Sequence, residues 1–243
     1  MINSEPLTLS VETATLAGSV ALTRGAAVLA SSNGDPTTSH SNTLILEIRD
    51  VLTQANLSLN EVDLLAVASG PGSFTGLRIG IATVKALAET LTRPCIGVPT
   101  LEAIALAAGA SEATVTLMPA GRGEVFVQMF SVDSAGRVRA LDQPAHVPPL
   151  KALQRYSDQA TIRFAGPGAK LHLDLIREVA HHEHYDFRPE DDLAKGWRIA
   201  SPAVSLARYI ALLGTERFTQ PGSYATKDLK ALYVRPSDAE LKA

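Results

Sequence analysis

The sequence is short of the residues that several classes of protein require. It has one cysteine in 243 residues, Cys95, which excludes an internal disulfide and a cysteine-rich zinc site; its apolar neighbours predict a buried side chain. The 22 basic residues are outnumbered by 25 acidic ones, so no large positive field is available for holding a nucleic-acid backbone. No apolar run approaches the roughly 20 residues of a membrane-spanning helix, and residues 1–6 lack the pattern of an export signal. We expect a soluble, cytoplasmic protein that makes no membrane contact and no strong nucleic-acid contact of its own.

The apolar share of the sequence, 46%, is enough for one or two compact lobes. In the first hundred residues its spacing predicts three antiparallel strands followed by a helix, a strand, a helix and a strand. The predicted ranges are 7–11, 18–23 and 26–30 for the three strands, then 41–56 (helix), 64–68 (strand), 75–91 (helix) and 95–98 (strand). This order is the one used by ribonuclease-H-like lobes, so the sequence predicts an α/β fold.

A second series of apolar runs predicts a second, smaller lobe. Strands are expected at 114–118, 124–132 and 161–165, and a last helix at 202–213 has apolar residues suited to packing across the two lobes. Residues 133–200 show no clean period. We predict a first lobe of residues 1–105, joined by part of 202–243, and a second lobe of residues 106–201.

A glycine turn stands between the strand at 64–68 and the helix at 75–91. It contains Gly70, Pro71, Gly72, Ser73, Thr75, Gly76 and Arg78. Backbone amides at the start of a helix bind anions, but the spacing matches neither the phosphate loop nor the dinucleotide fingerprint. Two readings stay open: an anion site, or a tight turn in which Ser73 or Thr75 caps the helix.

The helix at 75–91 has three faces when its residues are placed at 100° intervals. One is broadly apolar and suits the sheet, and a narrow stripe carries Arg78, Lys85 and Glu89. The third face is small and uncharged and consists of Ile79, Ala82, Thr83, Ala86 and Thr90. Small residues allow another helix to approach closely, which favours a subunit interface over the alternative of packing against the first helix of the same lobe.

Several segments together resemble the TsaB family. They are Leu9-Ser10-Val11-Glu12-Thr13-Ala14-Thr15, His40-Ser41, the run from Ser69 to Gly80, Gly97-Val98-Pro99-Thr100-Leu101-Glu102-Ala103, Gly123-Glu124-Val125-Phe126 and Tyr233-Val234-Arg235-Pro236. Their order and spacing cover most of residues 7–130 and the C-terminal segment. The Gly-Pro-Gly-Ser-Phe-Thr-Gly-Leu-Arg run is the specific part of the resemblance.

The resemblance implies two ribonuclease-H-like lobes of the actin, sugar-kinase and Hsp70 type. It also implies a role as partner of the catalytic paralogue TsaD, joined by the ATPase TsaE, in forming N6-threonylcarbamoyladenosine at position 37 of tRNA. The helices at 41–56 and 75–91 are expected to pack against TsaD, and two copies of the chain are expected to pair through the same two helices when TsaD is absent. The catalytic paralogue binds its metal through two histidines, and Thr100 and Ile104 fill those places here. Neither side chain replaces imidazole as a metal ligand, so we expect no catalytic residue and no metal.

Two departures from the resemblance bear on nucleotide binding. Glu12 stands where many relatives have aspartate, and the segment Met118–Gly123 carries Pro119, which lacks a backbone donor. Both lower the expectation of ATP binding by this chain alone, so ATP is expected only in the complex.

Two clusters of charged and histidine residues are candidates for a metal site or for exposed surface. His181-His182-Glu183-His184 lacks the pair of histidines at i and i+4 that a zincin helix uses, so a solvated loop is favoured over a metal site. Glu190-Asp191-Asp192 is read as exposed charge. The rival to a partner subunit is an autonomous enzyme of the same fold, either a nucleotide-dependent phosphotransferase or a metallopeptidase.

Overall fold

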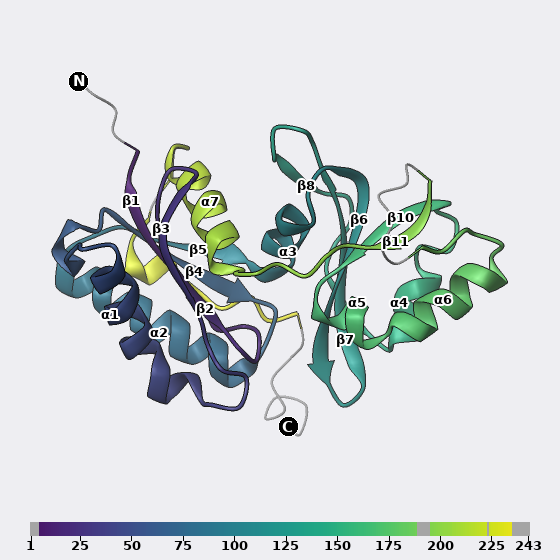
Figure 1. Ribbon diagram of the computed structural model, residues 1–243, viewed down its shortest axis with the longest axis horizontal. Helices are drawn as coiled ribbons and strands as arrows, with labels where there is room; N and C mark the ends of the chain where they lie inside the picture. Colours follow the sequence, from purple (N-terminus) through teal and green to yellow (C-terminus); the bar gives the residue numbers. More distant parts are fainter. Residues whose placement is uncertain (1–4, 189–194, 223, 235–243) are drawn as a thin grey trace. The chain divides into compact units, whose positions relative to one another are not determined.

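The computed structural model describes residues 5–188, 195–222 and 224–234, and they form two compact units. The first unit contains the described parts of Met1–Ala103 and Val204–Leu232. The second contains the described parts of Ile104–Ala203 and Tyr233–Ala243. Each unit has its own sheet and its own hydrophobic core (Figure 1).

The first unit is built on a five-stranded sheet in the order β3-β2-β1-β4-β5. The strands are β1 (Leu7–Glu12), β2 (Ser19–Arg24), β3 (Ala27–Asn33), β4 (Leu64–Gly70) and β5 (Cys95–Pro99). Strands β1 to β3 form an antiparallel meander, whereas β4 and β5 run parallel to β1. All residues of β1 and β4 are buried because helices cover both faces of the sheet.

Helices α1 (His40–Gln54) and α2 (Phe74–Leu91) lie on one face of this sheet, and α7 (Ala207–Phe218) lies on the other (Figure 1). The core between α1, α2 and the sheet includes Leu44, Ile48 and Val84. Short 3₁₀ turns occur at η1 (Leu59–Glu61) and η2 (Thr226–Asp228). The predicted order of strands and helices is therefore confirmed up to residue 99.

The second unit is built on a sheet in the order β11-β10-β6-β7-β8, with β9 also paired to β7. Its strands are β6 (Ser111–Gly121), β7 (Glu124–Val132), β8 (Val138–Ala140), β9 (Ala145–Val147), β10 (Thr161–Ala165) and β11 (Gly196–Ile199). Helices α4 (Pro149–Gln154), α5 (Pro167–Leu171) and α6 (Leu173–His182) pack on one face around Phe164 and Trp197. No described helix is both long enough and apolar enough to cross a membrane.

The start and packing of one predicted helix are wrong, and several other elements were not predicted. Helix α7 begins at Ala207 instead of residue 202, because the Ala207 amide donates to Ser19 Oγ and Val204 is 87% exposed. It packs on the first unit's own sheet. Helix α3 (Thr100–Ala108) was not expected, since its apolar residues show no clear helical period. Between residues 133 and 200 only the strand at 161–165 was predicted; the other elements were missed because most of them have three to six residues, too few for a period to show.

Candidate functional site

Helix α2 divides its predicted third face between two environments. Ile79 and Thr83 are half-buried, and Ile79 packs against the core cluster that α1 shares. Ala82, Ala86 and Thr90 are exposed. Because α1 contacts α2 directly, packing within the lobe accounts for one edge of the face and leaves the rest open.

The neighbouring helix α1 adds large apolar side chains to this exposed surface. Ile45 is 60% exposed and Leu46 is 48% exposed. We call these two residues and the five predicted on α2 the α1–α2 face. Exposed apolar and small side chains on two adjacent helices form a surface suited to close packing against another helix.

The glycine turn is a capped helix start. Ser73 is the N-cap of α2, and its Oγ accepts a hydrogen bond from the Gly76 amide at 3.2 Å. Thr75 is exposed within the first turn of the helix. The Arg78 guanidinium stacks 3.8 Å from the ring centroid of Phe74. The prediction that Ser73 or Thr75 caps the helix is thus confirmed for Ser73.

The space that an anion would need at this turn is filled by the turn between β1 and β2. The Ser73 amide donates to the Ala14 carbonyl at 2.8 Å. A Cβ added at Gly72 would lie 2.6 Å from the Ala14 Cβ, and one at Gly76 would lie 2.0 Å from the Thr13 carbonyl oxygen. The glycines therefore admit the protein's own backbone, and the residues do not fit a phosphate group at this place. Gly70 ends β4 with φ +113°, and Pro71 is buried beside it.

Glu12, the last residue of β1, is hydrogen-bonded to Thr15 of the same β1–β2 turn. Its carboxylate accepts from the Thr15 amide at 2.7 Å and from the Thr15 hydroxyl at 2.8 Å. The side chain is 1% exposed. Burial raises the pKa of Glu12 above its usual value, while the hydrogen bonds from Thr15 and the nearby His40 charge act in the opposite direction.

The positions filled by metal-binding histidines in the catalytic paralogue are buried here. Thr100 is fully buried, and Ile104 is 5% exposed. Glu102, on the same helix, pairs with Arg217 of α7 at 2.5 Å. Burial raises the pKa of Glu102, and the Arg217 charge opposes that effect. Within the described ranges, no three His, Cys, Asp or Glu side chains gather closely enough to hold a metal ion.

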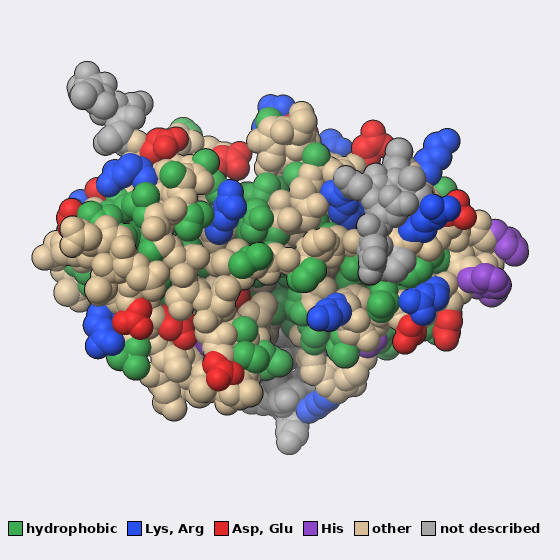
Figure 2. Space-filling view, viewed as in Figure 1, with side chains coloured by type: hydrophobic (Ala, Val, Ile, Leu, Met, Phe, Trp, Pro, Cys, Tyr) green, Lys and Arg blue, Asp and Glu red, His purple; other side chains and the backbone are tan. Residues whose placement is uncertain are grey.

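The histidine cluster ends a helix and is not the expected loop. His181 and His182 are the last two residues of α6, and both are exposed. His184 follows with φ +59°. Figure 2 shows histidine side chains standing out from the surface at this end of α6. The prediction for Glu190-Asp191-Asp192 lies outside the described residues.

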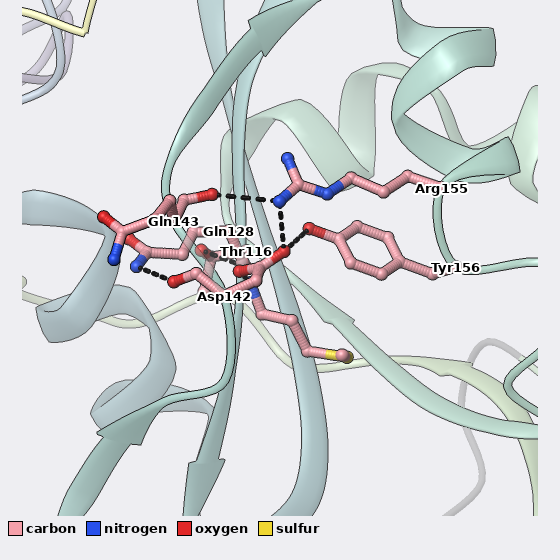
Figure 3. A network of polar contacts seen from close by, with 7 residues as sticks. Thr116, Gln128, Asp142, Gln143, Arg155 and Tyr156 are labelled. Carbon is pink, nitrogen blue, oxygen red and sulfur yellow. Dashed lines mark hydrogen bonds and ion pairs between the residues drawn. The ribbon is translucent and has the colours of Figure 1, made fainter.

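The second unit contains a polar network centred on Asp142, between β8 and β9 (Figure 3). One carboxylate oxygen accepts from the Met129 amide at 2.8 Å; the other accepts from the Tyr156 hydroxyl at 2.6 Å and pairs with Arg155 at 2.8 Å. The Asp142 carbonyl accepts from Gln128 Nε2 at 2.8 Å. Burial and the bond to Asp142 raise the pKa of Tyr156. The network holds the β8–β9 segment against β7 and the end of α4, so its role is to stabilise the fold of the second unit.

Residues 224–232 belong to the C-terminal segment, part of which was predicted to join the first lobe, and they contact the first unit's strands and core. The Cys95 amide donates to the Tyr224 carbonyl at 3.0 Å, and the Leu232 amide donates to the Ser69 carbonyl at 2.7 Å. Leu229 is 4% exposed and packs in the same core cluster as Cys95, which is buried as predicted. The segment thus covers the β5 edge and reaches the glycine turn.

Comparison with known proteins identifies the family. The family model described as TsaD, tRNA N6-adenosine threonylcarbamoyltransferase, matches residues 36–180, which is more than half of the chain. The TsaB protein of Escherichia coli is 37% identical over 132 residues, covering 53% of this chain and 56% of that protein's length. The TsaB protein of Bacillus subtilis is 25% identical over 173 residues, covering 70% of this chain and 75% of that protein.

A solved structure agrees over nearly the full length. YeaZ from Pseudomonas aeruginosa has a TM-score of 0.74 and 27% identity, and the match covers 94% of this chain and 99% of that one. The fold is therefore that of two ribonuclease-H-like lobes. Family model, sequence relatives and solved structure agree that the chain belongs to the TsaB family, within the wider group that the TsaD model describes.

Proposed function

We propose that this chain is a partner subunit without an active site of its own, and that it supports a TsaD-type transferase in forming N6-threonylcarbamoyladenosine at position 37 of tRNA. The observation that carries the proposal is the α1–α2 face. It exposes Ile45, Leu46, Ala82 and Ala86 on two adjacent helices of the first unit. Such a surface suits close packing against helices of another subunit.

The glycine turn also supports a subunit without an active site of its own. In the proposal it serves as a scaffold for the start of α2, because Thr13 and Ala14 fill it. The places of the paralogue's two metal ligands hold buried Thr100 and Ile104. The proposal therefore assigns all group transfer to the TsaD-type subunit, and it expects ATP only in the complex, where a TsaE-type ATPase joins.

The tRNA itself is assigned to another subunit. Acidic and basic side chains are interspersed over the face shown in Figure 2, and the whole chain carries a net charge of −3. Such a surface gives little counterion release on binding a phosphate backbone. A second copy of this chain is the proposed occupant of the α1–α2 face when the transferase is absent.

The test is to place charge on the small face of α2. Ala82→Glu or Ala86→Arg would bury an unpaired charge on docking, and we expect a loss of affinity for a TsaD-type transferase of at least about a hundredfold. The matched control is Ala26→Glu, at an exposed alanine of the β2–β3 turn. Thermal unfolding of each variant checks that the monomer keeps its fold. Unchanged affinity in both α2 variants would show that the α1–α2 face is not the interface.

The rival reading, an autonomous enzyme, is tested by titrating ATP and zinc separately into the isolated chain. The proposal expects no binding of either. Saturable binding of ATP or zinc, together with no binding of the transferase, would replace the partner subunit with an independent enzyme.

A further inference from the structure

The turn between β1 and β2 contacts the start of both helices that form the α1–α2 face. Toward α2, the Thr13 hydroxyl donates to the Gly76 carbonyl at 2.8 Å, and the Ala14 carbonyl accepts from the Ser73 amide. Toward α1, the Thr15 carbonyl accepts from Nε2 of His40 at 2.9 Å. His40 is the first residue of α1, so three consecutive turn residues fix two helix starts.

Glu12 decides the shape of this turn. Its two carboxylate oxygens hold the amide and the hydroxyl of Thr15, and the same hydroxyl oxygen accepts from the Gly18 amide at 3.2 Å. Gly18 has φ +70°, and a Cβ there would lie 2.7 Å from Cε1 of His40. The carboxylate, the hydroxyl and the imidazole therefore form one connected set around residues 12–18.

Burying the Glu12 carboxylate lowers the stability of the folded protein. The carboxylate is buried, and its hydrogen bonds come from uncharged donors of Thr15 and of the Ala14 backbone, while the nearby imidazole of His40 is bonded to the Thr15 carbonyl. A buried carboxylate without a bonded cation costs stability, and a neutral side chain that satisfied the same turn would avoid that cost. Ordinary turn formation does not require it.

We propose that the buried Glu12 and the half-buried Thr15 and His40 form a lock that holds the β1–β2 turn closed and thereby sets the starts of α1 and α2 relative to each other. Opening the lock shifts both helix starts together, so the α1–α2 face has its docking shape only while the lock is closed. The consequence for docking rests on the proposed function. The lock itself does not.

The first experiment measures the lock without any partner. Amide hydrogen exchange is followed at Ser73 and Gly76 for α2 and at Asn42 for α1, whose amide bonds the Ser39 carbonyl. Glu12→Gln keeps the side-chain shape but replaces one acceptor by a donor, so one of the two Thr15 donors, the amide or the hydroxyl, loses its acceptor. We expect exchange at both helix starts to accelerate on the order of tenfold.

Matched variants separate the lock from general destabilisation. Thr15→Val removes the hydroxyl and should act like Glu12→Gln, whereas Thr15→Ser keeps the hydroxyl and should exchange like the wild type. Glu47→Gln makes the same chemical change at a half-buried glutamate of α1 and is the control. If Thr15→Val does not fold, Glu12→Gln and Glu47→Gln still decide the result. Faster exchange confined to residues 12–18, with wild-type rates at Asn42 and Gly76, would overturn the lock.

A second measurement adds the transferase. Glu12→Gln should bind it more weakly than Glu47→Gln does, by about the factor by which exchange accelerates. Equal affinity of these two variants would overturn the link between the lock and docking. Absence of binding by the wild type would refute the proposed function instead, and the exchange rates would still settle whether the lock exists.

Discussion

Each unit contains one carboxylate at the centre of a polar network, and the two are held in opposite ways. Asp142 in the second unit has a bonded cation, Arg155, and its side chain keeps 18% of its exposure. Glu12 in the first unit is buried, and its hydrogen bonds come from Thr15 and from the backbone of Ala14. The charge of Asp142 is balanced by a cation, whereas the buried carboxylate of Glu12 carries a desolvation cost that its neutral donors offset only in part.

The largest effect should come from removing the better satisfied carboxylate. Asp142→Ala leaves the Met129 amide and the Tyr156 hydroxyl without their acceptor, and it unpairs Arg155. We expect the free energy of unfolding to fall by about 3 kcal/mol. Urea unfolding measures it, with Asp158→Ala, an exposed aspartate of the same unit, as control. A loss no larger than that of the control would mean that the network does little for stability.

A smaller loss is expected from filling the glycine turn. A Cβ at Gly76 would meet backbone, the Thr13 carbonyl oxygen, which cannot move without opening the β1–β2 turn. Gly76→Ala should therefore cost about 2 kcal/mol of unfolding free energy. Gly123→Ala is a useful contrast, since φ is +76° there but no atom lies within 4 Å of the added Cβ. Thermal unfolding of the two variants separates steric conflict from backbone strain.

Loss of the α2 cap comes next in size. Ser73→Ala removes the acceptor for the Gly76 amide and should lower the unfolding free energy by about 1 kcal/mol. Ser73→Asp retains an acceptor and should restore most of the loss. Chemical unfolding of the pair tests this, and equal stabilities of the alanine and aspartate variants would contradict the capping role.

The smallest expected effect is a pH dependence of stability that comes from the buried Glu12. Because burial raises the pKa of Glu12 in the folded protein, the folded state binds that proton more tightly than the unfolded state. Protonated Glu12 therefore adds to the stability of the folded state below its unfolded pKa of 4.5, and this stabilisation is lost as pH rises through its folded pKa. Relative to Glu12→Gln, the wild type should thus lose stability as pH rises above about 4.5. Midpoints of thermal unfolding from pH 4 to 8 measure the difference, and parallel curves would contradict a buried titrating Glu12.

The sequence predicts the local parts of this picture well. Helix α2 begins at Phe74 and ends at Leu91, within one residue of the predicted 75–91, because Ser73 caps its start and Thr92 and Pro94 end it. Strands β7 and β10 have the predicted limits, since each is a β-branched and aromatic run bounded by turn residues.

Contacts between distant residues could not be predicted in the same way. Thr15 meets His40 across 25 positions, and Cys95 meets Tyr224 across more than a hundred, without a periodic signal at either end. The Glu12 departure was visible in the sequence, but its bonds to Thr15 depend on the folded turn. Helix α3 was not predicted, because a helix that is buried on several sides lacks the apolar–polar period of 3.6 residues that marks an amphipathic helix.

The measurement that tests the central claim most directly is titration calorimetry of the isolated chain and of Ala86→Arg against a purified TsaD-type transferase. The account predicts saturable binding by the wild type and at least about a hundredfold weaker binding by Ala86→Arg, with thermal unfolding unchanged. Binding of equal strength by both proteins would contradict the assignment of the α1–α2 face, and binding by neither would contradict the partner role itself.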